Sequence, residues 1–335
     1  MVTIKDVARE TGVSVTTVSH VVNKTRYVKP QTIERVKAMI AELGYQPSGI
    51  AQALKANRTF TLGMIITNST NPFFTEVMRG VEATCNDQGY SLILCHSGDE
   101  MQKLVGYLKT LMSKRIDGLV VMTTNANQGF FNRLHQVRRI PVVAIDAMPS
   151  AVDCVVNDDS ALGGRIAGDF LIGRGFRRLA CIAGPPNHPR SIERVGGFKS
   201  ALAASGLDPH TLVTVPSDLT IGDGYRAMTQ LLRDRRTWPE AIFAGNDLLA
   251  MGALCAIHEH GLSVPDDISV IGYDDIELAS YTAPPLTTIR QPAFDIGAKA
   301  VDLVIQFLEK GEALPRLQTF PPILVERRSV GHAKA

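Results

Sequence analysis

The sequence predicts an α/β protein made of a three-helix N-terminal domain and a larger, doubly wound α/β body of two lobes. Residues 1–46 carry apolar residues at helical spacing with clear helix-end signals, whereas residues 59–335 alternate short apolar runs with helical stretches. A chain of 335 residues is longer than one small core requires, so two or three domains are expected. Residues 47–58 are expected to be a linker that contains a short helix.

The N-terminal domain begins with two helices separated by three residues. Helical spacing predicts the first over 4–11, and Gly12 ends it. Ser14 can cap the second, which is expected over 15–23. So short a connection is typical of a helix-turn-helix. A third helix, which starts at a proline, is expected over 30–43.

The second helix has two chemically different sides. Three valines fall on one side, whereas Thr16, His20 and Asn23 lie together on the other. The polar side is free to enter a groove of a nucleic acid. Composition and spacing alone leave a simpler interpretation open, namely a three-helix bundle with a solvated polar face.

The charge is distributed unevenly along the chain. Residues 1–60 hold nine Lys or Arg and four acidic residues, a net charge of +5, whereas the whole chain carries only +2 and the remainder therefore −3. A small basic domain on a slightly acidic body is typical of a module that binds a polyanion.

The composition favours a cytoplasmic protein without a membrane span. No apolar stretch approaches about 18 residues, and the N-terminus MVTIKDVARE carries charges where an export signal needs an apolar core. Neither the histidines nor the cysteines have the spacing of a metal site, so no metal is expected. The five cysteines are expected to be reduced and mostly buried: Cys85, Cys95, Cys154, Cys181 and Cys255.

The body contains repeated strand-helix units. Its apolar runs are LGMIIT, SLILCH, DGLVVM, PVVAID, DCVVND, RLACIAG, AIFAGND and ISVIGYDD. Such runs are typical of parallel sheets buried on both faces, and their number favours two lobes with a ligand at the carboxyl ends of the strands. No GxGxxG or GxxxxGK[ST] motif follows any of them, which argues against nucleotide-dependent chemistry.

Polar and aromatic residues follow these strands. They include Asn71, Phe73 and Phe74, then Asp146, Asn246, Asp247, Asp274, Asp275 and Gln291. Amides and carboxylates beside aromatic rings suit a polyol, and the set lacks the paired nucleophile and base that hydrolysis needs. Structural alternatives stay open: the two phenylalanines could be core, and Asn246, Asp247 and Asp274 could be helix caps.

Two stretches of the N-terminal part, VSVTTVSHVVNKTRYV and LGYQPSGIAQALKANRT, resemble the lactose-repressor (LacI) family of bacterial regulators. The resemblance extends over the body through NPFF, GNDLLAMGAL, IGYDDIELASYTAPPLTTIRQP and ILVERRS. It implies a body like the periplasmic sugar-binding proteins, with one lobe at about 59–160 and 291–321 and the other at about 161–290 and 322–330.

The resemblance implies how the N-terminal part meets DNA. Base edges in the major groove would face Val15, Thr16 and His20, with Val15 contacting a thymine methyl group. Phosphate or flanking contacts are implied for Thr17, Ser19, Asn23 and Arg26. In the linker, Leu54 stands where the family inserts a leucine into the minor groove, with Lys55 beside it. Ordinary packing of Leu54 against the body remains the alternative.

The resemblance also implies a sugar pocket. It assigns to this pocket Asn71, Phe73, Phe74, Asp146, Arg194, Leu219, Asn246, Asp274 and Gln291. Leu219 stands where an aromatic residue would close over the sugar ring, and Ala147 stands where ribose-binding proteins have arginine. Repressors of the family share the Ala147 departure, whereas Leu219 weakens stacking on the ring and suggests that a different pentose is admitted. For Arg194, a surface ion pair is the structural alternative.

The family implies a homodimeric, ligand-responsive repressor that binds a palindromic DNA operator. The body motifs favour ribose or a related sugar as the effector that releases operator DNA, and genes of ribose uptake and catabolism as targets. A purine corepressor or another sugar remains the alternative. Without a leucine heptad tail after 330, a dimer is expected rather than a tetramer. No cofactor and no catalytic residue are implied, so neither a transport receptor nor a sugar-modifying enzyme is favoured.

Overall fold

The computed structural model describes residues 2–23, 25–45, 58–66, 70–98, 100–122, 140–147, 152 and 154–334. The chain forms two compact units, Met1–Phe60 and Thr61–Ala335. The predicted linker residues Leu54 and Lys55 lie outside the described residues. In the part of the chain that the structure describes, no helix is both long and apolar enough to cross a membrane.

The first unit contains the three predicted helices, α1 (Ile4–Thr11), α2 (Val15–Asn23) and α3 (Pro30–Leu43). Their ends follow the residues that the sequence provides for capping. Gly12 adopts φ 63° after α1, and the hydroxyl of Ser14 accepts a hydrogen bond from Thr17 N at 3.0 Å. The helices enclose a small core of Val7, Ala8, Val18, Val21 and Val36.

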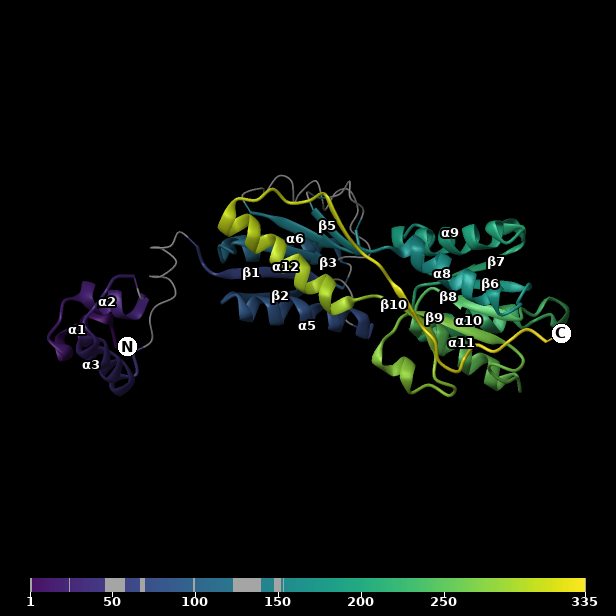
Figure 1. Cartoon of the computed structure of the whole chain (residues 1–335), viewed down its shortest axis with the longest axis horizontal. Helices are drawn as coiled ribbons and strands as arrows, with labels where there is room; N and C mark the ends of the chain where they lie inside the picture. Colours follow the sequence, from purple (N-terminus) through teal and green to yellow (C-terminus); the bar gives the residue numbers. More distant parts are fainter. Residues whose placement is uncertain are drawn as a thin grey trace. The chain divides into compact units, whose positions relative to one another are not determined.

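The second unit is built from two parallel-sheet lobes, as Figure 1 shows. In the N-lobe lie β1 (Thr61–Ile66), α5 (Pro72–Asp87), β2 (Ser91–His96), α6 (Met101–Ser113), β3 (Gly118–Met122), β4 (Val142–Ile145), β5 (Cys154–Asp158), α12 (Ala293–Lys310) and β11 (Leu317–Phe320). In the C-lobe lie α8 (Ser160–Gly173), β6 (Leu179–Ala183), α9 (Pro189–Ala204), β7 (Val213–Pro216), α10 (Ile221–Leu231), β8 (Ala241–Ala244), α11 (Asp247–Glu259), β9 (Ser269–Asp274), β10 (Thr287–Arg290) and β12 (Ile323–Val325). Short 3-10 helices cover Pro209–Thr211, Arg235–Thr237 and Glu277–Ser280.

The two sheets have the same doubly wound order. The N-lobe sheet runs β11-β5-β4-β3-β1-β2 and the C-lobe sheet β12-β10-β9-β8-β6-β7. All pairings are parallel except that of β10 with β12. In each lobe the strand order reverses beside the first strand, and ligands bind at such switch points outside the carboxyl ends. The two-lobed α/β fold predicted from the sequence is therefore confirmed.

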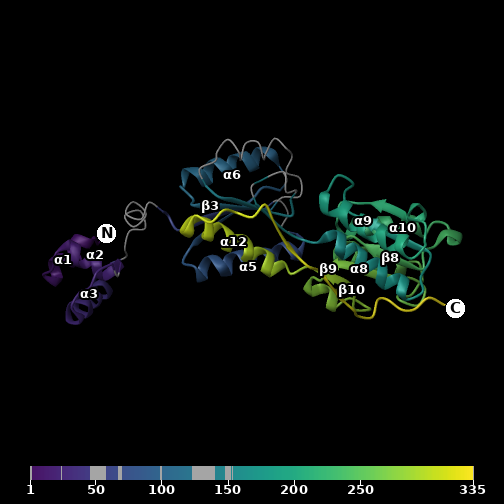
Figure 2. The same ribbon diagram turned by 45° about the horizontal axis from the view of Figure 1, so that its top comes forward.

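Successive strand residues serve opposite faces of each sheet. In β1, Met64 and Ile66 pack in the cluster that contains α5 and α12, whereas Ile65 packs in the cluster that contains α6. Both views show α5 beside α12 and α8 beside α9 (Figures 1 and 2). Burial on both faces explains why these strands appear in the sequence as unbroken apolar runs.

The chain passes between the lobes three times. The first crossing joins β5 to α8 at 158–160, the second joins β10 to α12 at 290–293, and the third joins β11 to β12 at 320–323. The first and third are bonded to each other, because Asp159 N donates to Phe320 O at 2.9 Å. The lobes are thus connected by a narrow group of segments at one place.

Two helices of the C-lobe, α8 and α9, approach closely through glycines. A Cβ on Gly164 would lie 1.9 Å from the carbonyl oxygen of Arg194, and one on Gly197 would lie 1.9 Å from that of Ala161. These are backbone atoms of regular helices, which cannot rotate away. The glycines therefore set the position of α9 and of the side chains at its N-terminal end.

We expect Gly164→Ala to lower the free energy of unfolding by about 1–3 kcal/mol, because the added methyl group overpacks the α8–α9 contact. Urea denaturation of the full chain measures this. Gly173→Ala is the matched control on the same helix, since a Cβ there meets nothing within 4 Å. This change lowers the backbone entropy of the unfolded chain and should raise the free energy of unfolding by at most about 1 kcal/mol. Equal effects of the two substitutions would contradict the close approach.

Candidate functional site

The polar side of α2 faces solvent. Val15, Thr16, Asn23 and Arg26 are exposed, and Thr17, Ser19 and His20 are half-buried. Val15, at 40% exposure, is an apolar residue at the beginning of the helix. The seven residues that the sequence assigns to DNA contact thus form a surface next to the α1–α2 turn; their contact with DNA stays a prediction.

Short hydrogen bonds fix two of these side chains. His20 Nδ1 lies 2.7 Å from the hydroxyl of Thr25, and Asn23 Nδ2 donates to Ser19 O at 2.9 Å. Because Nδ1 of His20 is engaged, recognition of a base would have to use Nε2. The contact with Thr25 therefore orients the His20 side chain in the protein alone.

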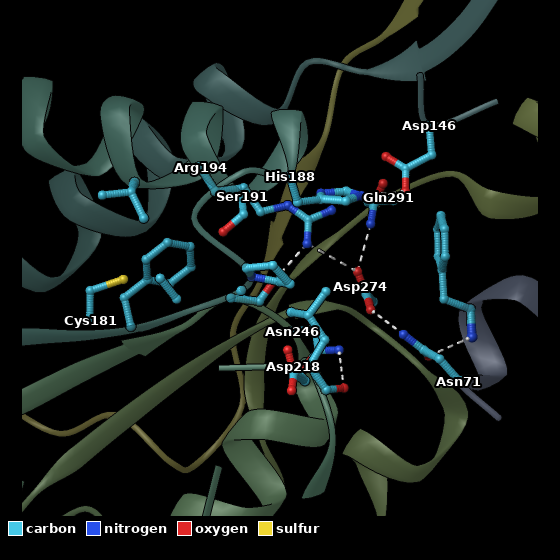
Figure 3. Close-up of a pocket in the computed structure, with 18 of the residues that line it drawn as sticks. Asn71, Asp146, Cys181, His188, Ser191, Arg194, Asp218, Asn246, Asp274 and Gln291 are labelled. Atoms are coloured by element: carbon cyan, nitrogen blue, oxygen red, sulfur yellow. Dashed lines mark hydrogen bonds and ion pairs between the residues drawn. The ribbon is translucent and has the colours of Figure 1, made fainter. Parts of the chain in front are cut away.

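The second unit contains a cavity of about 230 Å³ between the lobes, shown in Figure 3. All nine residues that the sequence assigns to ligand binding line it. The complete lining is Asn71, Phe73, Phe74, Asp146, Cys181, Ala183, Gly184, Pro185, His188, Ser191, Arg194, Val195, Asp218, Leu219, Phe243, Gly245, Asn246, Asp274 and Gln291. That these residues bind a ligand stays a prediction.

Phe73 and Phe74 are both core residues and cavity residues. They are 7% and 8% exposed, and their rings meet edge to face with centroids 5.6 Å apart. Asn71 caps their helix, since its Oδ1 accepts from Phe73 N at 3.0 Å. The core interpretation is therefore confirmed, and the same two residues also line the cavity, because the start of α5 forms its N-lobe wall.

Asp274 lies where three parts of the body meet. Its carboxylate accepts a hydrogen bond from Asn71 Nδ2 of the N-lobe at 3.2 Å and one from Gln291 Nε2 of the second crossing at 2.6 Å. Arg194 Nη1 of the C-lobe lies 3.8 Å away. Burial raises the pKa of Asp274 to about 6, against the opposing effects of Arg194, Asn71 and Gln291. Asp274 ends β9 and is not a helix cap.

Arg194 is buried rather than a surface residue, so the surface ion-pair alternative is wrong. The residue is 8% exposed, its Nη1 donates to Gly245 O at 2.7 Å, and its Cζ lies 3.8 Å from the centroid of the Tyr273 ring. Among the described residues, nothing accepts a hydrogen bond from its Nε. An acceptor oxygen of a ligand would satisfy this donor.

Asp146 lies opposite two residues of the C-lobe, His188 and Arg190. His188 Nε2 lies 3.7 Å and Arg190 Nε 4.0 Å from its carboxylate oxygens, and both distances exceed that of a hydrogen bond. The backbone of Asp146 is held by Asn157, whose Oδ1 accepts from Asp146 N at 2.8 Å. The carboxylate of Asp146 is thus held about 1 Å beyond hydrogen-bond distance from His188 and Arg190.

Asn246 is both a helix cap and a lining residue of the cavity, whereas Asp247 is neither. Asn246 caps α11, since its Oδ1 accepts from Leu249 N at 2.8 Å, and its Nδ2 donates to Leu219 O. Asp247 does not cap the helix but is fully buried, where it accepts from Thr288 and Ile276. Burial, followed by the negative charge of Asp274, raises the pKa of Asp247 well above its usual value.

Three polar residues of the lining were not among the predicted site residues: His188, Ser191 and Asp218. His188, which is 6% exposed, ends the loop after β6, and Ser191 lies in the first turn of α9, which follows that loop. Asp218 lies in the loop after β7. Applying the strand-end rule to the loop after RLACIAG would have found His188. The partly exposed β7 gives no apolar run, so Asp218 had no such signal.

The chemistry of the lining is that of a binding site. Its polar groups are donors and acceptors from both lobes, and they surround aromatic faces. Among the described residues, no group of His, Cys, Asp and Glu is arranged to hold a metal ion. Four of the five cysteines are buried and Cys255 is exposed, all of them free, as the sequence analysis expected.

The comparisons with known proteins agree with this architecture. Residues 3–48 match the family model of bacterial regulatory proteins of the lacI family. Residues 59–326 match the model of periplasmic binding proteins and the sugar binding domain of the LacI family. Together the two matches include both units of the chain.

Similar proteins match over nearly the full length. The ribose operon repressor of Escherichia coli (strain K12) is 43% identical, over 98% of this chain and all of that protein. The transcriptional repressor PurR of Edwardsiella ictaluri (strain 93-146) is also 43% identical, over 98% of this chain and 97% of that protein. The crystal structure of the lac repressor dimer bound to operator and the anti-inducer ONPF has a TM-score of 0.89 at 29% identity, over 98% and 99% of the two chains. This chain belongs to the LacI family of bacterial regulatory proteins.

Proposed function

We propose that the protein is a homodimeric transcriptional repressor that binds a palindromic DNA operator and is released from it by ribose or a related pentose. The observation that carries this proposal is the cavity, because residues from both lobes that the family resemblance assigned to a sugar line one enclosed space. A ligand that contacts both lobes can favour one arrangement of them over another.

The size and polarity of the cavity support a monosaccharide. A volume of about 230 Å³ is below the range of about 300–1,000 Å³ for drug-sized ligands. Asp274 Oδ1 and Oδ2 each accept one hydrogen bond, from Gln291 and Asn71 respectively, and have further lone pairs for sugar hydroxyls. Phe73 and Phe74 offer apolar faces for the C–H side of the ring. The identity with the ribose operon repressor favours ribose within this class.

The exposed surface of α2 supports DNA recognition. Thr16 and His20 can hydrogen-bond to base edges, Val15 can contact a thymine methyl group, and Thr17, Ser19, Asn23 and Arg26 can contact phosphates. Leu54 and Lys55 are proposed to meet the minor groove of the operator when the linker folds on DNA. Base contacts would specify the sequence, and phosphate contacts would position the domain without specifying it.

The link between the two sites is proposed to be lobe closure. The three crossings are the segments about which the lobes can rotate, and closure in a dimer changes the separation of the two DNA-binding domains. Ribose can weaken operator binding only by its preference for one lobe arrangement, and a coupling of about 1–3 kcal/mol is typical.

The second candidate is a purine-responsive repressor in which the effector strengthens DNA binding. One observation favours it, the equal 43% identity with PurR of Edwardsiella ictaluri. Leu219 does not distinguish the two candidates, because an aliphatic residue at this place stacks on neither a sugar ring nor a purine as an aromatic ring would.

The test is selection of duplex sequences by the purified full chain from a random pool, followed by binding with ribose, other pentoses, hypoxanthine or guanine. We expect a palindromic duplex to be enriched and ribose to weaken its binding about 5- to 150-fold. Strengthened binding with hypoxanthine or guanine, and no effect of any pentose, would replace the proposal by the second candidate. Failure to enrich any sequence would reject both.

We expect His20→Ala to reduce binding to the selected duplex about 10-fold or more, with little effect on a random duplex, because a base contact is lost. Arg26→Ala is the matched control, because loss of a phosphate contact should weaken binding to both duplexes alike. It should also reduce the slope of log affinity against log salt concentration by about one. Fluorescence anisotropy at several salt concentrations measures both. An equal loss on both duplexes for His20→Ala would show that it contacts the backbone.

The raised pKa of Asp274, about 6, predicts a pH dependence. Because sugar hydroxyls donate to the ionised carboxylate, ribose affinity should rise roughly 10-fold from pH 5 to pH 7 and then level off. The contribution of Asp274 to folding has the opposite sign: its pKa is raised above the unfolded value, so stability is present below about pH 4 and is lost as the pH rises through about 6.

Calorimetric titration with ribose at several pH values measures this dependence. Asp274→Asn should bind ribose more weakly and flatten the profile. The ring of His188 also faces the cavity, so His188→Gln serves as the control and should keep the profile. A profile that flattens only in His188→Gln would assign the dependence to the histidine.

A further inference from the structure

Tyr273 is a buried residue of β9 that contacts two lining residues of the cavity, Arg194 and Phe243. It is 0% exposed and is not part of the cavity lining. Neither its ring nor its hydroxyl group has a role in the proposed binding of sugar. Its ring contacts Arg194 of the C-lobe, and its hydroxyl group bonds to Asp158 of the N-lobe.

The ring of Tyr273 supports Arg194. The guanidinium carbon of Arg194 lies 3.8 Å from the ring centroid, well within the distance of a cation–π interaction. Nη1 of the same arginine lies 3.8 Å from Asp274, and Figure 3 shows Arg194 and Asp274 together at the cavity. A ligand that moves the guanidinium therefore alters its contact with this ring.

The hydroxyl group of Tyr273 binds the other lobe. It donates a hydrogen bond to Asp158 Oδ2, and Asp158 is the last residue of β5 in the N-lobe sheet, at the first crossing. Burial raises the pKa of Asp158, whereas the positive charge of Arg194 and the bond from Tyr273 lower it. Arg194, Tyr273 and Asp158 are thus one electrostatic unit that spans both lobes.

The surroundings of this bond leave little room for adjustment. A Cβ on Gly163 would lie 2.2 Å from the Tyr273 hydroxyl oxygen, so the first turn of α8 closes directly over it. The other oxygen of Asp158 accepts from Ser160 Oγ at 2.9 Å, a bond within the crossing itself. The next residue, Asp159, is bonded to Phe320 of the third crossing.

We propose that Tyr273 is a positioning residue that transmits effector contact at Arg194 to the first crossing and so sets the angle between the lobes. The inference rests on the proposed function and deepens it, since it names the route by which the cavity governs DNA binding. The buried hydrogen bond from Tyr273 to the Asp158 carboxylate suits this role, because hydrogen bonds to charged groups are strong and directional.

The test compares the full-length wild type with Tyr273→Phe, Asp158→Asn and Ser160→Ala. Tyr273→Phe keeps the ring under Arg194 and removes only the bond between the lobes. Asp158→Asn keeps an acceptor but removes its charge. Ser160→Ala, the matched control, removes the bond to Asp158 that lies within one crossing. Thermal unfolding verifies that each variant is folded at the assay temperature.

The measured quantity is the ribose response, the ratio of the dissociation constants of the selected duplex with and without saturating ribose. We expect Tyr273→Phe to lower this ratio to about one third of the wild-type value or less, while ribose affinity measured by calorimetry changes no more than about 5-fold. Asp158→Asn should be intermediate and Ser160→Ala unchanged. A full response in Tyr273→Phe, or a loss of ribose affinity equal to the loss of response, would overturn the inference.

A second measurement separates this inference from the proposed function. If ribose leaves the wild type unaffected, the proposed function fails. Hydrogen exchange without any ligand then decides on Tyr273 alone. Amides at 159–163 should exchange about 10-fold faster in Tyr273→Phe than in wild type or Ser160→Ala, because the crossing is released. Equal rates would overturn the inference.

Discussion

The buried carboxylate of Asp274 is the interaction on which the arrangement of the body depends. It accepts from Asn71 of the N-lobe and Gln291 of the second crossing, and it lies beside Arg194 of the C-lobe. A buried charge is costly unless it is paired and hydrogen-bonded. These partners therefore have to stay close to it, and any ligand that enters the cavity meets a carboxylate already shared by both lobes. In the proposed function, Asp274 is therefore the group at which the ligand meets both lobes, and Arg194 beside it connects to Tyr273 and the first crossing.

Much of the fold and site could be predicted from the sequence, because the signals are local. Gly12, Ser14 and Pro30 mark helix ends by their backbone and capping chemistry, and the structure has α1, α2 and α3 where these signals lie. The strand-end residues from Asn71 to Gln291 could be placed around one cavity because doubly wound sheets collect ligand-binding side chains at their carboxyl ends.

The rest depends on distances between residues far apart in the chain. Tyr273 lies inside a buried strand, where the sequence does not distinguish it from an ordinary core residue. Its hydrogen bond joins it to Asp158, 115 residues away in the chain. The sequence likewise does not tell that Asp247 is buried with Thr288, 41 residues away, rather than capping α11. β11 is partly exposed and has no apolar run, and β12 has only three residues, so neither of these strands at the crossings was among the predicted ones.

The central claim is that occupation of the cavity and DNA binding by the first unit share one free energy of coupling. Thermodynamic linkage requires the effect to be reciprocal. The most direct measurement is calorimetric titration of ribose into the free protein and into the protein saturated with its selected duplex. The account predicts weaker ribose binding to the duplex-bound protein, by the same factor by which ribose weakens the duplex. Identical ribose affinity in both titrations would contradict it.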